Sequence, residues 1–74
     1  MGELESKLSR ELRYYRIKMR RKARGMRNII LFKKKNMVDF DTNITRICNQ
    51  YLKRNNKRDV IKLQRLYINK FLEL

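Results

Sequence analysis

Histidine and proline are absent from this 74-residue chain, and cysteine occurs once, at Cys48. The lack of histidine removes the commonest general base and the commonest metal ligand. A single cysteine forms no internal disulfide and no zinc site, which favours a reducing compartment. The seven acidic residues are scattered along the chain and form no evident catalytic pair. We therefore expect no enzymatic activity, no catalytic residue and no metal site.

Long apolar runs are also missing. The longest one is Ile29-Ile30-Leu31-Phe32, far shorter than the ~20 residues that a membrane-spanning helix needs. The first five residues contain two glutamates and no apolar stretch typical of a secretory signal. We expect neither a transmembrane segment nor a cleaved targeting sequence.

Positive charge, in contrast, is abundant: 21 Lys and Arg residues give a formal net charge of +14. A charge of this size predicts an anionic partner, which is nucleic acid, a membrane surface or a strongly acidic protein. Seven of these cations lie within residues 13–24, with no acidic residue among them. Because like charges repel, this stretch is stabilised by an anionic partner rather than by itself. No RRM, KH or zinc signature accompanies it.

The absence of proline and the presence of two glycines, Gly2 and Gly25, favour helix along most of the chain. Apolar residues at steps of three and four predict a first helix over residues 3–24, which stops at Gly25. We predict a short second helix from Met26 to Asn36 and a loop over residues 37–41. The stripe of the first helix consists of Leu4, Leu8, Leu12, Tyr15 and Met19.

A third amphipathic helix is predicted over residues 44–52, with N-cap candidates at Asp41, Thr42 and Asn43. Asn55 and Asn56 interrupt the pattern, and a further stripe follows. The pattern leaves open whether residues 44–72 form one helix or two. The two stripes consist of Ile44, Ile47, Cys48, Tyr51 and Leu52, and of Val60, Leu63, Tyr67, Phe71 and Leu74.

These patterns predict an all-α protein with a single domain over residues 1–74. We expect a three-helix or four-helix antiparallel bundle. A chain of this length buries only roughly 60% of its unfolded surface. Further apolar residues widen the last stripe beyond what two short neighbouring helices cover, so we expect a partner to complete the bundle. They are Ile61, Leu66, Ile68 and Leu72.

The segment over residues 12–20 resembles the motif of the LYR family of small mitochondrial proteins. Tyr15 and Arg16 match the tyrosine and arginine of the motif, and Met19 and Arg20 match its tail. Tyr14 takes the place of the motif leucine, and Lys18 that of an apolar residue. The later residues that resemble the family pattern are Phe32, Asn36 and Asp39.

The resemblance implies a basic three-helix adaptor, assembly factor or accessory subunit of a complex in the mitochondrial matrix. It implies an acidic partner, the acyl carrier protein, whose acyl-phosphopantetheine arm inserts between the helices, while the chain itself binds no cofactor. The partner-binding residues would be Arg13, Tyr15, Arg16, Arg20, Arg24, Lys33 and Arg46. Residues lining the core or the acyl chain would be Leu12, Met19, Ile30, Phe32, Ile47 and Tyr51.

A second interpretation fits the same charge. Small basic RNA-binding proteins, such as ribosomal proteins on ribosomal RNA, hold phosphates with Lys and Arg. Tyr14 and Tyr15 would then be available for base stacking. A viral or phage DNA-binding protein is a third interpretation.

Overall fold

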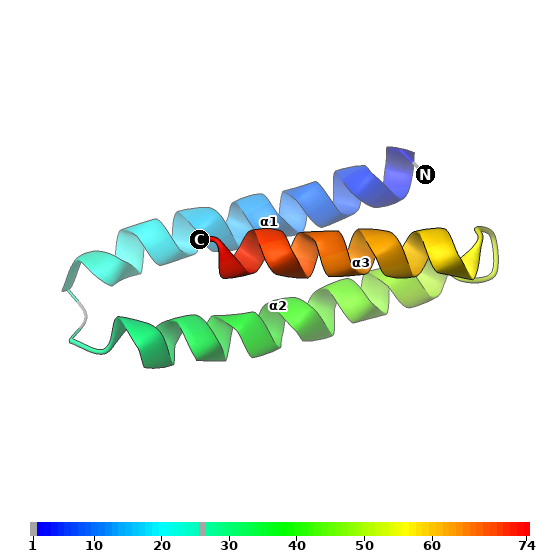
Figure 1. Ribbon diagram of the computed structural model, residues 1–74. Helices are drawn as coiled ribbons and strands as arrows, with labels where there is room; N and C mark the ends of the chain where they lie inside the picture. Colours follow the sequence, from blue (N-terminus) through cyan, green and yellow to red (C-terminus); the bar gives the residue numbers. More distant parts are fainter. Residues whose placement is uncertain (1, 26) are drawn as a thin grey trace.

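The computed structural model describes residues 2–25 and 27–74. It contains three α-helices, α1 (Gly2–Lys22), α2 (Ile29–Tyr51) and α3 (Lys57–Leu72), and a 3₁₀ turn, η1 (Ala23–Gly25), that follows α1. Within these residues there is no β-strand. Figure 1 shows the chain reversing direction at each of its two connections, so that the helices lie side by side in a rod of 43 × 17 × 17 Å. The prediction of an all-α protein is confirmed.

Helix α1 occupies the range that its apolar stripe predicts. Glutamates lie in its first turn and the basic residues Arg20, Arg21 and Lys22 in its last turn, an arrangement that the helix dipole favours. All five stripe residues are buried. The helical path continues through η1 and ends at Gly25, as predicted.

Helix α2 joins the second and third predicted helices into one, so the predicted loop over residues 37–41 is wrong. Asn36, which was expected to end a helix, lies inside α2 and is 2% exposed. Its Nδ2 donates to the backbone oxygen of Phe32 at 2.8 Å. The polar residues after it are likewise compatible with helix, because Thr42 Oγ1 donates to the Val38 carbonyl at 2.9 Å.

The N-cap of α2 is Asn28 rather than a residue of the 41–43 segment. Its Oδ1 accepts from the backbone nitrogen of Leu31 at 3.1 Å. Met26, which the sequence placed in the second helix, lies outside the described residues.

Residues 44–72 belong to two helices, and the predicted interruption at Asn55 and Asn56 is confirmed. Asn55 Nδ2 donates to the carbonyl of Tyr51 at 3.2 Å at the end of α2. Asn56 is the N-cap of α3, since its Oδ1 accepts from the backbone nitrogen of Arg58 at 2.9 Å. Two adjacent asparagines thus close one helix and open the next.

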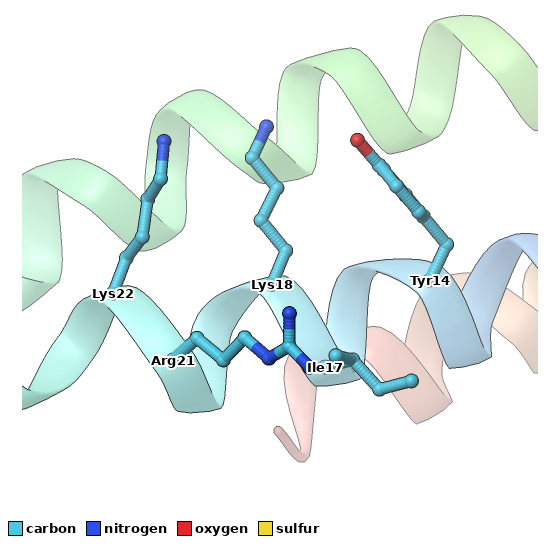
Figure 2. Close-up of a pocket in the computed structure, with 5 residues that line it drawn as sticks. All are labelled: Tyr14, Ile17, Lys18, Arg21 and Lys22. Carbon is cyan, nitrogen blue, oxygen red and sulfur yellow. The ribbon is translucent and has the colours of Figure 1, made fainter.

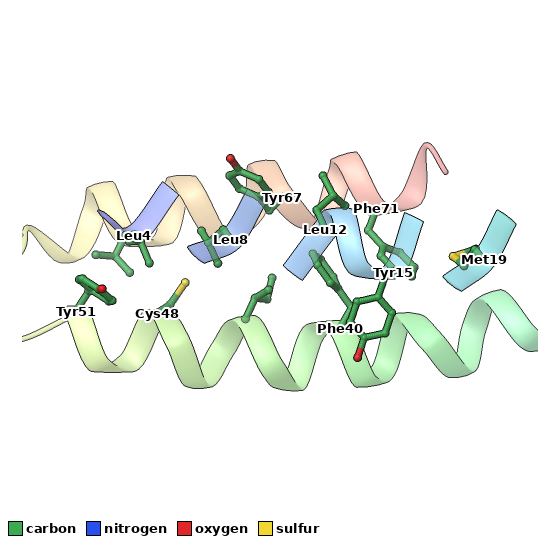
Figure 3. Packing of buried hydrophobic residues seen from close by; sticks show 12 residues of the cluster. Leu4, Leu8, Leu12, Tyr15, Met19, Phe40, Cys48, Tyr51, Tyr67 and Phe71 are labelled. Carbon is green, nitrogen blue, oxygen red and sulfur yellow. The ribbon is translucent and has the colours of Figure 1, made fainter. Parts of the chain in front are cut away.

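The core lies between the three helices and includes one aromatic ring from each (Figure 3). Phe40 of α2 and Phe71 of α3 stack with ring centroids 4.8 Å apart. Tyr15 of α1 meets both rings edge-on, at 5.6 Å and 6.0 Å. Such pairs favour one relative placement of the helices, because their geometry is specific.

Hydrogen bonds between side chains of different helices favour the same relative placement. Asn43 Nδ2 of α2 donates to the Tyr15 hydroxyl of α1 at 3.0 Å. The hydroxyls of Ser9 and Tyr67 lie 2.6 Å apart and join α1 to α3. Gln64 Nε2 of α3 donates to Thr45 Oγ1 of α2 at 3.0 Å.

Asn36 places an unpaired polar atom in this core. Its Oδ1 is buried, and no donor among the described residues reaches it. A buried acceptor without a donor costs about 1–3 kcal/mol. We predict that Asn36→Leu, which removes the acceptor at similar volume, raises the thermal midpoint by roughly 4–8 °C per kcal/mol gained. Circular dichroism melting measures this.

The control for this prediction is Asn36→Asp, which keeps the size and shape of the side chain but places an unpaired charge in the core. It is expected to lower the midpoint. An Asn36→Leu variant that melts at or below the wild-type temperature would contradict the assignment of an energetic cost to Oδ1.

Candidate functional site

One end of the rod is built by two helices instead of three. Figure 1 shows that α1 and α2, with the turn between them, extend beyond the end of α3. We call this part, residues 16–25 and 27–35, the hairpin end. It is the region where the sequence places its densest positive charge.

The hairpin end holds 10 of the 21 Lys and Arg residues and none of the seven Asp and Glu residues. It therefore carries +10 of the formal net charge of +14. The rest of the chain carries 11 Lys and Arg residues and all seven acidic residues, a net charge of +4. Because exposed charges interact over about 8 Å at physiological ionic strength, neighbouring cations at this end repel one another.

Aliphatic side chains are exposed among these cations. Ile29 is 50% exposed, Ile30 70% and Leu31 63%, all in the first turn of α2. On α1, Ile17 is 47% exposed. An exposed apolar group ringed by charge is typical of a protein–protein or membrane contact.

A groove of about 550 Å³ opens where the three helices meet at the hairpin end. Its α1 wall contains Arg16, Met19 and Arg20, its α2 wall contains Ile29 and Lys33, and the residues after α3 close it. Those closing residues are Glu73 and Leu74. The groove thus combines an apolar floor with three cations and one acid at its rim.

Lys33 has a second role at the edge of this groove. Its Nζ donates to the backbone oxygen of Leu72 at 3.0 Å. A lysine at a helix C-terminus satisfies a free carbonyl and favours the negative end of the helix dipole. Lys33 therefore holds the end of α3 against α2.

A second, smaller groove of about 320 Å³ lies along α1 (Figure 2). Tyr14, Lys18 and Lys22 extend in one direction from the helix, and Ile17 and Arg21 lie beside them. The exposed Tyr14 ring meets the buried Tyr15 ring edge-on with centroids 5.2 Å apart. Tyr14 is thereby held in place while its ring stays accessible.

The predicted partner-binding residues divide into three groups. Arg16, Arg20 and Lys33 line the same groove, and Arg24 is exposed beside Arg20 at the hairpin end. The remaining two basic residues, Arg13 and Arg46, are exposed elsewhere. Arg46 lies about 20 Å further along α2 than Lys33.

Tyr15, also predicted to face the partner, is buried with its ring in the core. Arg16 next to it is exposed. The two neighbours therefore point in different directions: Tyr15 packs in the core, and Arg16 lies on the surface.

The predicted core or acyl-chain residues mostly pack as expected. Leu12, Met19 and Tyr51 are buried, and Phe32 and Ile47 pack against the core while partly buried. Ile30 is the exception, since its side chain is 70% exposed and does not pack in the core. The run of four apolar residues spans more than one face of α2, so it cannot all point inward.

The predictions from the sequence did not include the other residues that line the groove. Ile29, Glu73 and Leu74 join the site because α3 ends beside the first turn of α2. The apolar run at the start of α2 was a signal for Ile29. No local pattern indicated Glu73, because its place depends on how α3 is positioned against α1 and α2.

Burial raises the pKa of the Tyr15 phenol above its ordinary value of 10.0. The nearby Glu11 and Asp39 carboxylates and Tyr14 raise this pKa further, while the hydrogen bond from Asn43 lowers it. Burial also raises the pKa of the Cys48 thiol from 9.0. Both groups therefore favour their neutral forms in the folded protein.

Within residues 2–25 and 27–74, no cluster of three or more acidic, histidine or cysteine side chains suits a metal ion. None of the helices in this part of the chain combines the length and apolar character needed to cross a membrane. Comparisons with protein-family models, curated proteins and solved structures gave no match. We therefore infer function from the charge and geometry of the described residues.

The raised pKa of Tyr15 predicts a loss of stability at alkaline pH. Well below pH 10.0 the phenol is neutral in both the folded and the unfolded state. Above it, the unfolded chain releases the proton before the folded protein does, so the free energy of unfolding falls as the pH rises. We expect this fall to be less steep in Tyr15→Phe, measured by urea unfolding at several pH values.

The raised pKa of Cys48 also makes the free energy of unfolding fall as the pH rises. This effect starts at a lower pH, because the ordinary pKa of the thiol is 9.0. The comparison is therefore made in a Cys48→Ala background. If the slopes above pH 10.0 are equal with and without Tyr15→Phe, the buried phenol does not couple its proton to folding.

Proposed function

We propose that this protein is a non-enzymatic helical adaptor that binds a strongly acidic protein through the hairpin end. The supporting observation is that one end of the molecule combines ten cations, no acidic residue and an exposed aliphatic turn. An acidic protein surface offers both carboxylates for the cations and apolar side chains for the isoleucines. We further propose that the antiparallel bundle is completed by this partner.

The more specific form of the proposal is an adaptor or assembly factor of the LYR type in the mitochondrial matrix, with the acyl carrier protein as partner. Its support is the pair at positions 15 and 16: Tyr15 is anchored in the core, while Arg16 beside it is exposed at the groove. A buried neighbour fixes the helix position from which Arg16 meets an anion.

The centre of the core limits how an acyl chain would be held. Leu4, Leu8, Phe40 and Phe71 are fully buried against one another and their neighbours. Insertion of an acyl-phosphopantetheine arm between the helices would require these side chains to move. Recognition of the acidic partner through the hairpin end requires no such movement.

RNA binding is the second candidate, and one observation favours it. Tyr14 exposes 57% of its surface beside Lys18, Arg21 and Lys22. Base stacking on an aromatic ring with phosphate contacts from nearby cations is typical of proteins that bind single-stranded RNA. Aliphatic residues such as Leu31 have no corresponding partner on RNA, so we place this function second.

The proposed site is tested by reversing charge at two places. Arg16→Glu with Arg20→Glu changes the hairpin end, and Arg58→Glu with Arg65→Glu changes the exposed face of α3 by the same number of charges. With purified acylated acyl carrier protein at fixed salt, we expect the first pair to weaken binding at least about tenfold, ~1.4 kcal/mol. We expect the second pair to weaken binding less, because its charges act on the partner only over a longer distance that salt screens.

Calorimetric titration measures both affinities. Equal losses for the two pairs would show that total charge, not the hairpin end, determines binding. Wild-type protein that fails to bind the acyl carrier protein would overturn the specific form of the proposal.

RNA binding makes a different prediction for Tyr14. Because base stacking on an aromatic ring contributes about 1–3 kcal/mol, Tyr14→Ala would weaken binding of a single-stranded RNA oligonucleotide by the corresponding factor. The adaptor proposal predicts that Tyr14→Ala leaves binding of the acidic protein nearly unchanged. Tyr14→Phe, which keeps the ring, is the control, and fluorescence anisotropy measures both.

A further inference from the structure

Helix α3 ends before the two helices that it packs against. Lys33 marks the level of its last turn, because the Lys33 ammonium donates to the Leu72 carbonyl. Beyond that level, α1 continues from Arg16 to Lys22, about 10 Å or roughly two turns. The groove is lined by residues of this length of α1, by the start of α2 and by the residues after α3.

The floor of the groove is apolar and faces inward. Met19 is the last residue of the buried α1 stripe. Ile29 lies on α2 seven residues before Asn36, on the same face of the helix as the buried residues. Ile29 is nevertheless half-exposed, because the described part of α3 does not reach it.

The rim of the groove is cationic. Arg16 and Arg20 are one helical turn apart on α1, and both line the groove. Glu73 is the one acidic residue at the rim. The surrounding hairpin end contributes further cations on both helices.

We propose that an acidic amphipathic helix of a partner protein occupies this groove. This inference rests on the proposed function and adds its mode of recognition. Leucine-like side chains of the guest helix cover Ile29 and Leu74, and its carboxylates meet Arg16 and Arg20. Helix-in-groove binding of this kind uses apolar anchors at i, i+3 or i+4, and i+7.

Charge and shape together favour this occupant. A second copy of the chain would bring another +10 hairpin end against the first. A flat anionic membrane would meet the protruding Ile30 and Leu31 before the inward-facing Ile29. An acidic helix supplies charge of the required sign and a narrow apolar face that fits between α1 and α2.

The test uses a stapled helical peptide of about 12 residues, long enough for three turns. It carries leucines at i, i+3 and i+7 and glutamates at its flanks. A scrambled peptide of the same composition keeps the charge and loses the apolar face. We expect the wild-type protein to bind the patterned peptide more tightly than the scrambled one.

Two variants of α2 locate the contact. Ile29→Glu introduces a carboxylate in the groove, and Val38→Glu introduces the same charge at an exposed position of α2 outside the hairpin end. A glutamate in the first turn of α2 is favoured by the helix dipole, so Ile29→Glu leaves the helix intact. We expect Ile29→Glu to weaken binding of the patterned peptide at least about tenfold and Val38→Glu to have a much smaller effect.

Three outcomes overturn the inference while leaving the proposed function in place. They are equal binding of the two peptides, equal losses in the two variants, and unchanged binding in Ile29→Glu. Failure of the wild-type protein to bind the acyl carrier protein and any other acidic protein overturns the proposed function itself. A circular dichroism melt of each variant confirms that the helices are intact.

Discussion

One aromatic ring from each helix meets at a single level of the rod, and the arrangement of the three helices depends on this contact. Phe40 and Phe71 stack, and Tyr15 closes the group edge-on. Each such pair contributes about 0.5–1.5 kcal/mol beyond the area that it buries. Because α3 ends at Leu72, one residue after Phe71, this contact lies at the end of α3, next to the hairpin end.

Beyond that level the physical character of the molecule changes. The hairpin end carries ten cations without an acidic residue, and its inward-facing Ile29 is half-exposed. Lys33 uses one of the charges to hold the end of α3. We propose that relief of the repulsion among the others requires an anionic partner, and that the exposed isoleucine requires this partner also to be apolar. Both requirements meet at one groove.

The apolar periodicity of α1 was sufficient to predict its range and its buried face. The middle of α2 was mispredicted, because Asn36 and Thr42 belong to residue types that usually end or cap helices. Here their side chains bond to carbonyls of their own helix instead. The basic half of the site was visible in the sequence as a charge run. Its apolar half was not, because the exposure of Ile29 depends on where α3 lies and ends.

The most direct measurement is an NMR titration of the ¹⁵N-labelled protein with an acidic partner. We expect the amide shifts to change in residues 16–25 and 27–35 and in the residues after α3, near Glu73. The exposed basic face of α3, with Arg58 and Arg65, serves as the internal reference. Shift changes spread equally over both regions would contradict a localised site and indicate that binding follows net charge alone.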